Sequence, residues 1–223
     1  MEIREKRKYV KNPNRSLVIL KSTLSRLPIY YCYLQAAHKA GMEYISSAVL
    51  ATKLALNPVQ VRKDLASVST QPGRPKCGFR TEQLLIDMKN YLGYDDIVEA
   101  VIVGVGNFGS TLLQYKGFND HGVNIAAGFD INPELQGKRL NGKSILAMER
   151  FTPYVKREHI RIGIIAVPPA EAQKVADLMA KSGIKAIWNF APTHVFVRKG
   201  VMIKNENLAA SLAMLSKQFT KPA

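Results

Sequence analysis

The chain has 223 residues, of which 47% are hydrophobic, and it carries a formal net charge of +15. This length suits one large domain or two small ones. No apolar run reaches the roughly 18 residues of a membrane span, and the basic N-terminus lacks the apolar core of a secretory signal. The two cysteines are far apart and fit no ligand pattern, so we expect reduced cytoplasmic thiols, no disulfide scaffold and no metal site.

The positive charge is concentrated toward the N-terminus. Residues 1–90 hold 16 Lys and Arg against 6 Asp and Glu, whereas residues 91–223 hold 16 against 11. This imbalance suits a polyanion partner, although a solvated basic surface has the same composition. Residues 1–15 alternate charged residues with few apolar ones, and we interpret them as a mobile basic arm.

Short helices are predicted in residues 16–92. The first opens at Ser22-Thr23-Leu24 and ends near Gly41, and a second covers residues 48–55. Asn57-Pro58 starts a third, because Asn is a preferred N-cap and Pro a preferred first helical residue. A short helix, a tight turn and a polar helix fit a helix-turn-helix, although short helix pairs also occur in domains that bind no DNA.

The third helix has an apolar face and a face suited to DNA. Val61, Leu65 and Val68 share the apolar side. The opposite side carries amide and cationic groups, for which we predict DNA contacts: Gln60, Arg62 and Lys63.

A hairpin rich in Gly and Pro follows, at residues 71–79, and it carries Arg74 and Lys76 near its tip. The wing of a winged helix has this composition, because a cation on a loop can enter the minor groove while a helix occupies the major groove. An ordinary exposed loop is the alternative. A helix over residues 81–91 then leads to a domain boundary near Gly93–Asp96.

Strand and helix patterns alternate in residues 93–204. Strands are expected at 99–103, 123–129, 161–167 and 185–189, with helices at 110–116 and 170–182. This alternation predicts a parallel sheet with right-handed crossovers. We therefore predict an α/β protein: a winged-helix DNA-binding domain (16–92), a Rossmann parallel-sheet domain (93–204) and a separate C-terminal helix (205–223).

The first of these strands ends in Gly-x-Gly-x-x-Gly, formed by Gly104, Gly106 and Gly109, and Asp130 follows 21 residues after the last glycine. The glycines allow a tight turn, approach of a pyrophosphate and close helix packing. A carboxylate at Asp130 suits the ribose hydroxyls of NAD and repels the 2′-phosphate of NADP. A glycine turn that binds nothing is the alternative.

The last helix, predicted over residues 205–219, has an apolar face of Leu208, Leu212, Leu215 and Phe219. Such a face covers either its own domain or a partner subunit.

Together the motifs resemble those of Rex, a family of bacterial redox-sensing transcriptional repressors, from about Ser22 to Gln218. Four segments carry the resemblance: Ser25 to Tyr31, Gln60 to Leu65, Val103 to Gly109 and Asn189 to Pro192. The resemblance implies a homodimer that exchanges C-terminal helices and binds operator DNA. It also implies that NADH releases the DNA and that genes for NADH-consuming metabolism are repressed when NADH is scarce.

The resemblance also implies residue roles. Arg62 and Lys63 match base-contacting cations, and Arg74 and Lys76 both remain candidates for the wing residue in the minor groove. The expected contacts to NADH or NAD come from the glycine turn, Asp130 and two pocket segments: Gly104, Gly106, Asn107, Phe108, Gly109, Asp130, Val167, Pro168, Phe190, Ala191 and Pro192.

One part of the family pattern is altered in this chain. Tyr115 matches a switch tyrosine, but Asn207 stands where the family has an aspartate and Cys32 where it has an arginine. Because both charges are lost together, no unpaired charge remains and the fold need not suffer. The switch is different, because a ligand shifts a conformational equilibrium only through interactions that differ between the two conformations. We expect a weaker or rerouted NADH response, with the adjacent Glu206 as a substitute, and a Cys32 packed in its helix.

Two other functions compete with a repressor that is not an enzyme. An NAD-dependent oxidoreductase would need a placed acid or base and a substrate domain, and neither is recognisable. The second competing function is that of a dimeric DNA-binding protein with a vestigial Rossmann domain.

Overall fold

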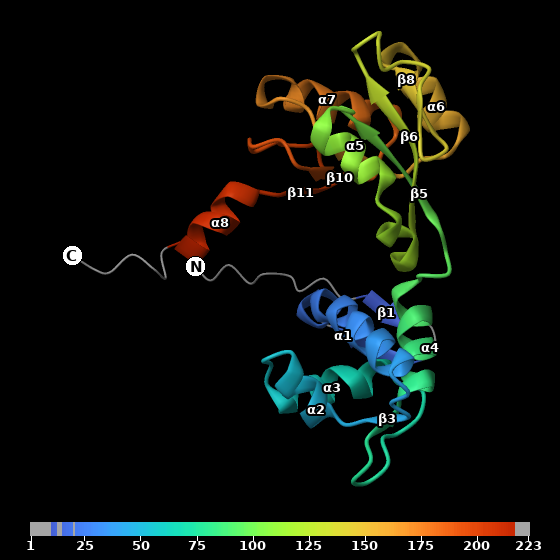
Figure 1. Cartoon of the computed structure of the whole chain (residues 1–223), viewed down its shortest axis with the longest axis vertical. Helices are drawn as coiled ribbons and strands as arrows, with labels where there is room; N and C mark the ends of the chain where they lie inside the picture. Colours follow the sequence, from blue (N-terminus) through green and yellow to red (C-terminus); the bar gives the residue numbers. More distant parts are fainter. Residues whose placement is uncertain (1–9, 13–14, 20, 217–223) are drawn as a thin grey trace, which may run out of the picture. The chain divides into compact units, whose positions relative to one another are not determined.

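The computed structural model describes residues 10–12, 15–19 and 21–216 and divides into two compact units, Met1–Asp95 and Asp96–Ala223 (Figure 1). The division falls in the segment where the sequence indicates a domain boundary. No described helix is long and apolar enough to cross a membrane.

The first unit is a small helical domain whose residues 21–95 contain one short antiparallel sheet. Its elements are α1 (Lys21–Lys39), β3 (Tyr44–Ile45), α2 (Ser47–Lys53), α3 (Pro58–Val68), β4 (Phe79–Arg80) and α4 (Thr81–Leu92). Apolar side chains of the four helices form its core, among them Leu27, Leu34, Leu50, Leu65, Leu84 and Met88. The strands β3 and β4 pair antiparallel, and the hairpin predicted as a wing, residues 71–79, leads directly into β4.

The N-terminal segment differs from the expected arm. Strands β1 (Val10–Asn12) and β2 (Arg15–Ile19) pair antiparallel, with Val10 opposite Ile19. This ribbon crosses the predicted boundary at residue 15, because β-branched residues on both sides of that boundary favour extended backbone. Residues 1–9 of the expected arm lie outside the described part of the chain.

The second unit is built on a seven-stranded sheet in the order β11-β10-β9-β5-β6-β8-β7. Its strands are β5 (Val98–Val103), β6 (Val123–Asp130), β7 (Arg139–Leu140), β8 (Lys143–Ala147), β9 (Ile162–Ile165), β10 (Ala186–Asn189) and β11 (Met202–Asn205). All neighbours pair parallel except β7 with β8. The order reverses beside the central β5, as in a Rossmann fold, so ligands are expected beyond the carboxyl ends of β5 and β9.

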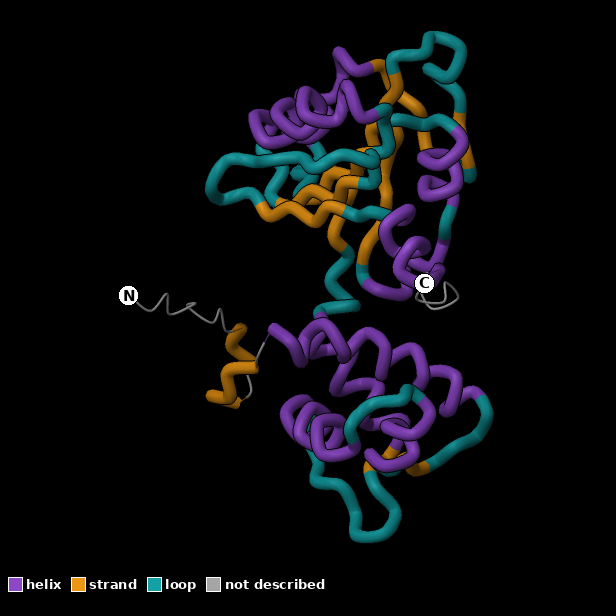
Figure 2. Tube along the Cα trace, turned by 90° about the vertical axis from the view of Figure 1, so that its left-hand side faces the viewer, coloured by secondary structure: helices purple, strands orange, loops and turns teal. Residues whose placement is uncertain are grey.

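Helices lie on both sides of these strands (Figure 2). One face carries α5 (Asn107–Gln114) and the 3-10 turn η1 (Lys116–His121), and its core includes Leu113 and Ile125. The other face carries the 3-10 turn η2 (Met148–Arg150), α6 (Phe151–Arg157) and α7 (Pro169–Ser182). There Phe129 meets Phe151 edge to face, with ring centroids 5.0 Å apart.

Several elements of the second unit were not predicted from the sequence. The sequence predicts no element in residues 135–160, where β7, β8, η2 and α6 lie, and α5 begins three residues before its predicted start. The sequence also assigns Asn205 to the last helix, whereas Asn205 ends β11 and pairs with Asn189 of β10. These strands are short and lie at the edges of the sheet or, for β8, next to an edge, so their sequences lack the long apolar run of β5.

The last helix, α8 (Leu208–Ser216), exposes its apolar side chains. None of its residues is buried, and Leu212 is 68% exposed. Its own unit therefore does not cover this face. The predicted fourth member of the face, Phe219, lies outside the described residues.

Candidate DNA-binding surface and dinucleotide site

Helix α3 presents cations from a firmly capped start. The Asn57 side chain accepts hydrogen bonds from the amides of Val59 and Gln60, at 2.9 and 3.2 Å. Val61 and Leu65 are fully buried, whereas Arg62 and Lys63 are exposed. The helix thus fixes two cations on the side away from its core.

Asp64 is the centre of a buried hydrogen-bond network that was not predicted from the sequence. Its side chain is only 2% exposed. Arg26 of α1 donates to both oxygens, at 2.7 and 3.0 Å, and Tyr30 donates to Oδ2 at 2.9 Å. Thr23 and Gln60 donate to Oδ1, at 3.0 and 2.9 Å. Four of these five hydrogen bonds come from α1 and fix it to α3 through one carboxylate, and the fifth, from Gln60, lies within α3.

This network sets the protonation of its members. Burial alone would raise the pKa of Asp64, but the hydrogen bonds from Arg26, Tyr30, Gln60 and Thr23 outweigh it and hold the pKa below its ordinary value of 3.8. Burial, followed by the hydrogen bond to Asp64, raises the pKa of Tyr30 to about 12. The carboxylate is therefore charged and the phenol a donor at neutral pH.

The network also restricts one predicted DNA contact. The Gln60 side chain is exposed, but its amide nitrogen donates to Asp64. Its carbonyl oxygen and the second hydrogen of its amide group are left to face a partner. Because the bond to Asp64 fixes the amide group, the network limits the orientations in which Gln60 can meet a base.

The predicted wing is a tight hairpin that separates its two cations. Arg74 and Gly78 exchange backbone hydrogen bonds of 2.7 and 2.9 Å at its base. The Arg74 guanidinium lies over the Tyr44 ring, 5.3 Å from its centroid. Lys76 is at the tip, exposed and with a φ of +64°. Gly78, with a φ of +92°, lies so close to the backbone of Ile45 that a side chain would not fit.

The glycine turn after β5 has the predicted geometry. Gly104 adopts a φ of +91°, and a side chain there would collide with the carbonyl of Ala166, the residue after β9. A side chain at Gly109 would meet the Gly104 carbonyl, whereas Gly106 borders open space. No side chain caps the start of α5, so its first amides face a prospective anion.

Asp130 is anchored by backbone amides at the end of β6. Its Oδ2 accepts from the Val105 amide at 2.6 Å, and its Oδ1 accepts from Asn132 at 2.8 Å. Each oxygen retains a lone pair. The carboxylate is therefore oriented by the glycine turn while it stays able to accept hydrogen bonds from a ligand.

A cavity of about 250 Å³ opens at this point. Five of the predicted cofactor residues line it: Gly104, Gly106, Asp130, Val167 and Pro168. Its other lining residues, not found from the sequence, are Val103, Ile131, Met148, Ala166, Glu171 and Val175. Small-molecule sites usually span about 300–1,000 Å³, so this cavity suits part of a dinucleotide.

The other predicted cofactor residues lie outside that cavity. The rings of Phe108 and Phe190 pack together with centroids 5.1 Å apart. Asn189, which is fully buried, accepts from the Ala191 amide at 3.0 Å and donates to the Thr193 carbonyl at 2.8 Å. This asparagine holds the loop that contains Phe190, Ala191 and Pro192. Asn107 is exposed, as the first residue of α5.

The expected switch residues have separate environments. Tyr115 is 59% exposed and meets Phe118 edge to face at 5.0 Å. Cys32 is exposed, so the expected packing is wrong, because the buried side of α1 is occupied by residues such as Leu27 and Leu34. Asn207 caps α8 by accepting from the Ala210 amide at 2.8 Å.

Glu206 makes contacts that the sequence did not reveal. Its Oε1 accepts from the Trp188 indole at 2.9 Å and pairs with Lys204 at 2.5 Å. The hydrogen bond from Lys204, and then that from Trp188, lowers the pKa of Glu206. Trp188 in turn packs on Phe190, with centroids 4.4 Å apart. One side chain, that of Trp188, thus separates Glu206 from the predicted nicotinamide loop.

Comparisons with known proteins agree on both units. Residues 95–193 match the family model "CoA binding domain", and residues 19–66 match "Putative DNA-binding protein N-terminus". The redox-sensing transcriptional repressor Rex of Porphyromonas gingivalis is 39% identical over 193 residues, which cover 86% of this chain and 88% of the relative. Its counterpart in Treponema denticola is 36% identical, over 86% and 91% of the two chains.

Solved structures agree with these relatives. RSP, a Rex-family repressor, in complex with β-NAD+ and operator DNA matches with a TM-score of 0.83 and 32% identity, over 91% of this chain and 93% of that one. RSP in complex with β-NADH matches with a TM-score of 0.80, over 91% and 95%.

Proposed function

Because the chain belongs to the Rex family of redox-sensing transcriptional repressors, we propose that it represses transcription by binding operator DNA and that NADH and NAD modulate this binding. The observation that carries the proposal is the pairing of two sites in one chain. A capped helix presents Arg62 and Lys63, and a glycine turn orients Asp130. RSP, which shares the fold, is known with both cofactor forms and with operator DNA.

The DNA contacts follow from the first unit. Arg62 and Lys63 reach base edges in the major groove from α3, and Gln60 contributes a carbonyl acceptor. Lys76 enters the minor groove, since it is at the tip of the wing while Arg74 is held against Tyr44 at the base.

The dinucleotide contacts follow from the second unit. Asp130 accepts from the adenosine ribose, the turn of Gly104 and Gly106 and the free amides of α5 bind the pyrophosphate, and the loop at Phe190 faces the nicotinamide. The charge of Asp130 favours NAD(H) over NADP(H). The dinucleotide acts as a signal and no hydride is transferred, in keeping with relatives named as repressors.

The molecule acts as a homodimer joined through α8. Leu208, Leu212 and Leu215 are between 57% and 68% exposed in the single chain. Burying a leucine side chain is worth about 1.5–3 kcal/mol, so a second copy that covers this helix gains substantial stability.

The NADH signal passes through Glu206 in this chain. Asn207 carries no charge and is engaged in capping α8, so it does not replace the family's aspartate. Glu206 is charged and comes directly before Asn207, the residue that caps α8. Its side chain contacts Trp188, which packs beside the nicotinamide loop. A change at Phe190 on binding NADH therefore reaches the start of α8 through two contacts.

One titration tests the proposal. A labelled duplex from the gene's own promoter is titrated with protein at fixed salt, with NADH, NAD or neither, and fluorescence anisotropy is recorded. Binding that NADH weakens more than NAD supports a redox-sensing repressor. In parallel, fluorescence of Trp188, the single tryptophan, reports dinucleotide binding. DNA binding without any dinucleotide signal would instead indicate a vestigial Rossmann domain, and oxidation of NADH with a metabolite acceptor would indicate an enzyme.

A further inference from the structure

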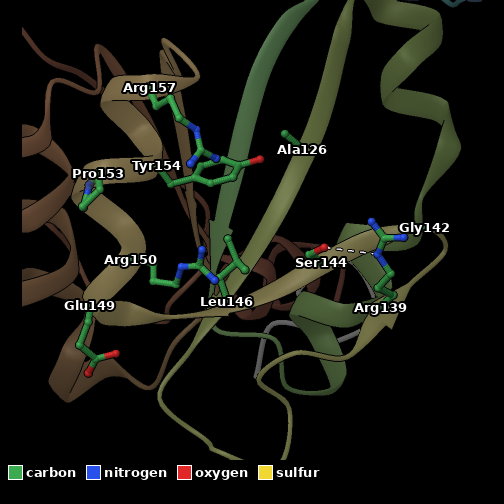
Figure 3. Close-up of a pocket in the computed structure, with 10 residues that line it drawn as sticks. All are labelled: Ala126, Arg139, Gly142, Ser144, Leu146, Glu149, Arg150, Pro153, Tyr154 and Arg157. Atoms are coloured by element: carbon green, nitrogen blue, oxygen red, sulfur yellow. Dashed lines mark hydrogen bonds between the residues drawn. The ribbon is translucent and has the colours of Figure 1, made fainter.

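A second and larger cavity lies in the Rossmann unit, with a volume of about 570 Å³ (Figure 3). It shares no lining residue with the cavity at Asp130. Its walls come from β6, from the β7–β8 hairpin and from the η2–α6 segment. The two cavities are therefore separate sites.

The hairpin wall is fixed by local sequence. Asn141 and Gly142, with φ values of +50° and +78°, form the turn between β7 and β8. Positive φ at both central residues is the geometry of a type I′ hairpin, for which Asn-Gly is the preferred sequence. The turn sets Arg139 opposite Ser144 in the antiparallel pair, and Arg139 donates to the Ser144 hydroxyl at 3.4 Å.

The opposite wall supplies two more arginines. Arg150 and Arg157 extend from the η2–α6 segment toward the sheet, and Arg139 lies across from them (Figure 3). Arg157 stacks on the Tyr154 ring at 5.4 Å and pairs with Glu158 at 2.6 Å. In the part of the chain that the structure describes, Arg139 and Arg150 form no ion pair.

Arg157 is paired with Glu158, but the charges of Arg139 and Arg150 are not balanced by a carboxylate of the described residues. Among the described residues that line the cavity, only Glu149 carries a carboxylate, and it points away from the three guanidinium groups (Figure 3). Guanidinium groups that share a concave space repel one another, and the repulsion is relieved when an anion enters. The planar fork of arginine matches the paired oxygens of a phosphate.

We propose that this cavity binds a small phosphorylated molecule, with its phosphate held between Arg139 and Arg150. Arg157 and Tyr154 form a flat surface beside that position, suited to the organic part of the ligand. The volume lies within the range of small-molecule sites. The proposal concerns a site separate from the dinucleotide cavity and does not depend on the repressor function.

Calorimetry with the full-length protein tests this site. Sodium pyrophosphate is the probe, titrated at constant ionic strength in the presence of saturating NADH so that the Asp130 site is occupied. The unmodified chain is compared with the double variant Arg139→Gln/Arg150→Gln and with Arg161→Gln. Arg161 is exposed in the same unit but does not line this cavity, so it is a control for loss of positive charge.

The double variant should bind pyrophosphate at least about tenfold more weakly, because each lost arginine removes a charge-assisted hydrogen bond. Arg161→Gln should bind within about twofold of the unmodified chain. Circular dichroism and NADH affinity should be unchanged in both, since the arginines are exposed.

Three results would overturn the proposal. The unmodified chain could give no pyrophosphate signal, or the double variant could bind as well as the unmodified chain. Arg161→Gln could lose as much affinity as the double variant, which would indicate diffuse electrostatics. A duplex of unrelated sequence is titrated as a separate arm. If the double variant loses affinity for that duplex but not for pyrophosphate, the arginines contact the DNA backbone instead.

Discussion

Asp64 and Asp130 are two carboxylates with opposite roles in the two units. Asp64 is 2% exposed and accepts five hydrogen bonds, all from side chains of its own unit. Asp130 is only partly buried and accepts one backbone amide on each oxygen. Both are held in place, but only Asp130 keeps capacity for a ligand.

The difference shows how one residue type serves structure or function. A carboxylate surrounded by its own side-chain donors has no reason to bind anything else, and it positions the cations beside it on α3. A carboxylate oriented by backbone amides at the mouth of a cavity is prepared for hydroxyl donors from a ligand. The number of donors that the fold already supplies separates the two roles better than burial alone.

The largest effect should follow from Asp64→Asn. The amide removes the charge opposite Arg26 and places a donor among four donor groups. Because Arg26 keeps some exposure, we expect the free energy of unfolding to fall by about 2–3 kcal/mol, below the full cost of breaking a buried pair. Urea unfolding followed by circular dichroism measures it.

Glu82→Gln is the matched control, because Glu82 pairs with Arg80 at an exposed site of the same unit. This change should alter the unfolding free energy by less than about 0.5 kcal/mol. NADH affinity, read from Trp188 fluorescence, should be unaffected by Asp64→Asn. An Asp64→Asn protein as stable as Glu82→Gln would show that the network is not structural.

Asp130→Ala should have the converse effect on the second unit. Loss of the ribose acceptor should weaken NADH binding by about tenfold to a hundredfold, as expected for one or two hydrogen bonds to a charged group. The preference for NADH over NADPH should fall with it. Calorimetry measures both affinities, and Asp177→Ala, which removes an exposed carboxylate held by Gln173, is the control. Unchanged NADH affinity would remove Asp130 from the site.

A spacing motif in the sequence predicts the role of Asp130, whereas only helical periodicity indicates that Asp64 is buried. The spacing of glycines and a distant acid has a known geometric meaning, and the structure reproduces it at Gly104 and Asp130. Asp64 lies between Val61 and Leu65 on the stripe that includes Val68, so helical periodicity places it in the core. A charge on that stripe requires donors, but the sequence does not say that α1 supplies them.

Other features depended on tertiary contacts and were not predictable. The strand β11 is a four-residue edge strand that is defined by its pairing with β10, and its sequence carries no long apolar run. The arginine cavity joins the β7–β8 hairpin to α6, two segments that no spacing rule connects. The contact of Trp188 with Glu206 likewise joins two strand ends through the fold.

The pH dependence of stability should separate Asp64 from other acids. Its pKa is lower in the folded chain than the ordinary 3.8, so its stabilisation is complete above that value and is lost as the pH falls through the folded pKa. The stability difference between the unmodified chain and Asp64→Asn should therefore be constant near neutral pH and shrink below about pH 4. Urea unfolding across this range measures the difference. The other acidic residues contribute equally to the stability of both proteins, so their contributions cancel. A difference that persists unchanged in acid would mean that Asp64 is not the titrating group.

The smallest effect concerns Glu206, which is intermediate between the two aspartates. Its side chain is 25% exposed and accepts from Trp188 while it pairs with Lys204. Glu206→Gln keeps an acceptor for the indole but removes the charge. We expect the NADH-driven loss of DNA affinity to shrink by about fivefold, the lower end of typical coupling energies.

Anisotropy titrations with and without NADH measure this coupling, and Glu134→Gln, at an exposed position of the same unit, is the control. DNA affinity without NADH and NADH affinity without DNA should both stay within about twofold, because Glu206 contacts neither predicted site directly. If Glu206→Gln retains the full NADH response, the charge at Glu206 does not carry the signal. The switch would then have to run through Tyr115 and Phe118, the aromatic pair on the other side of Trp188.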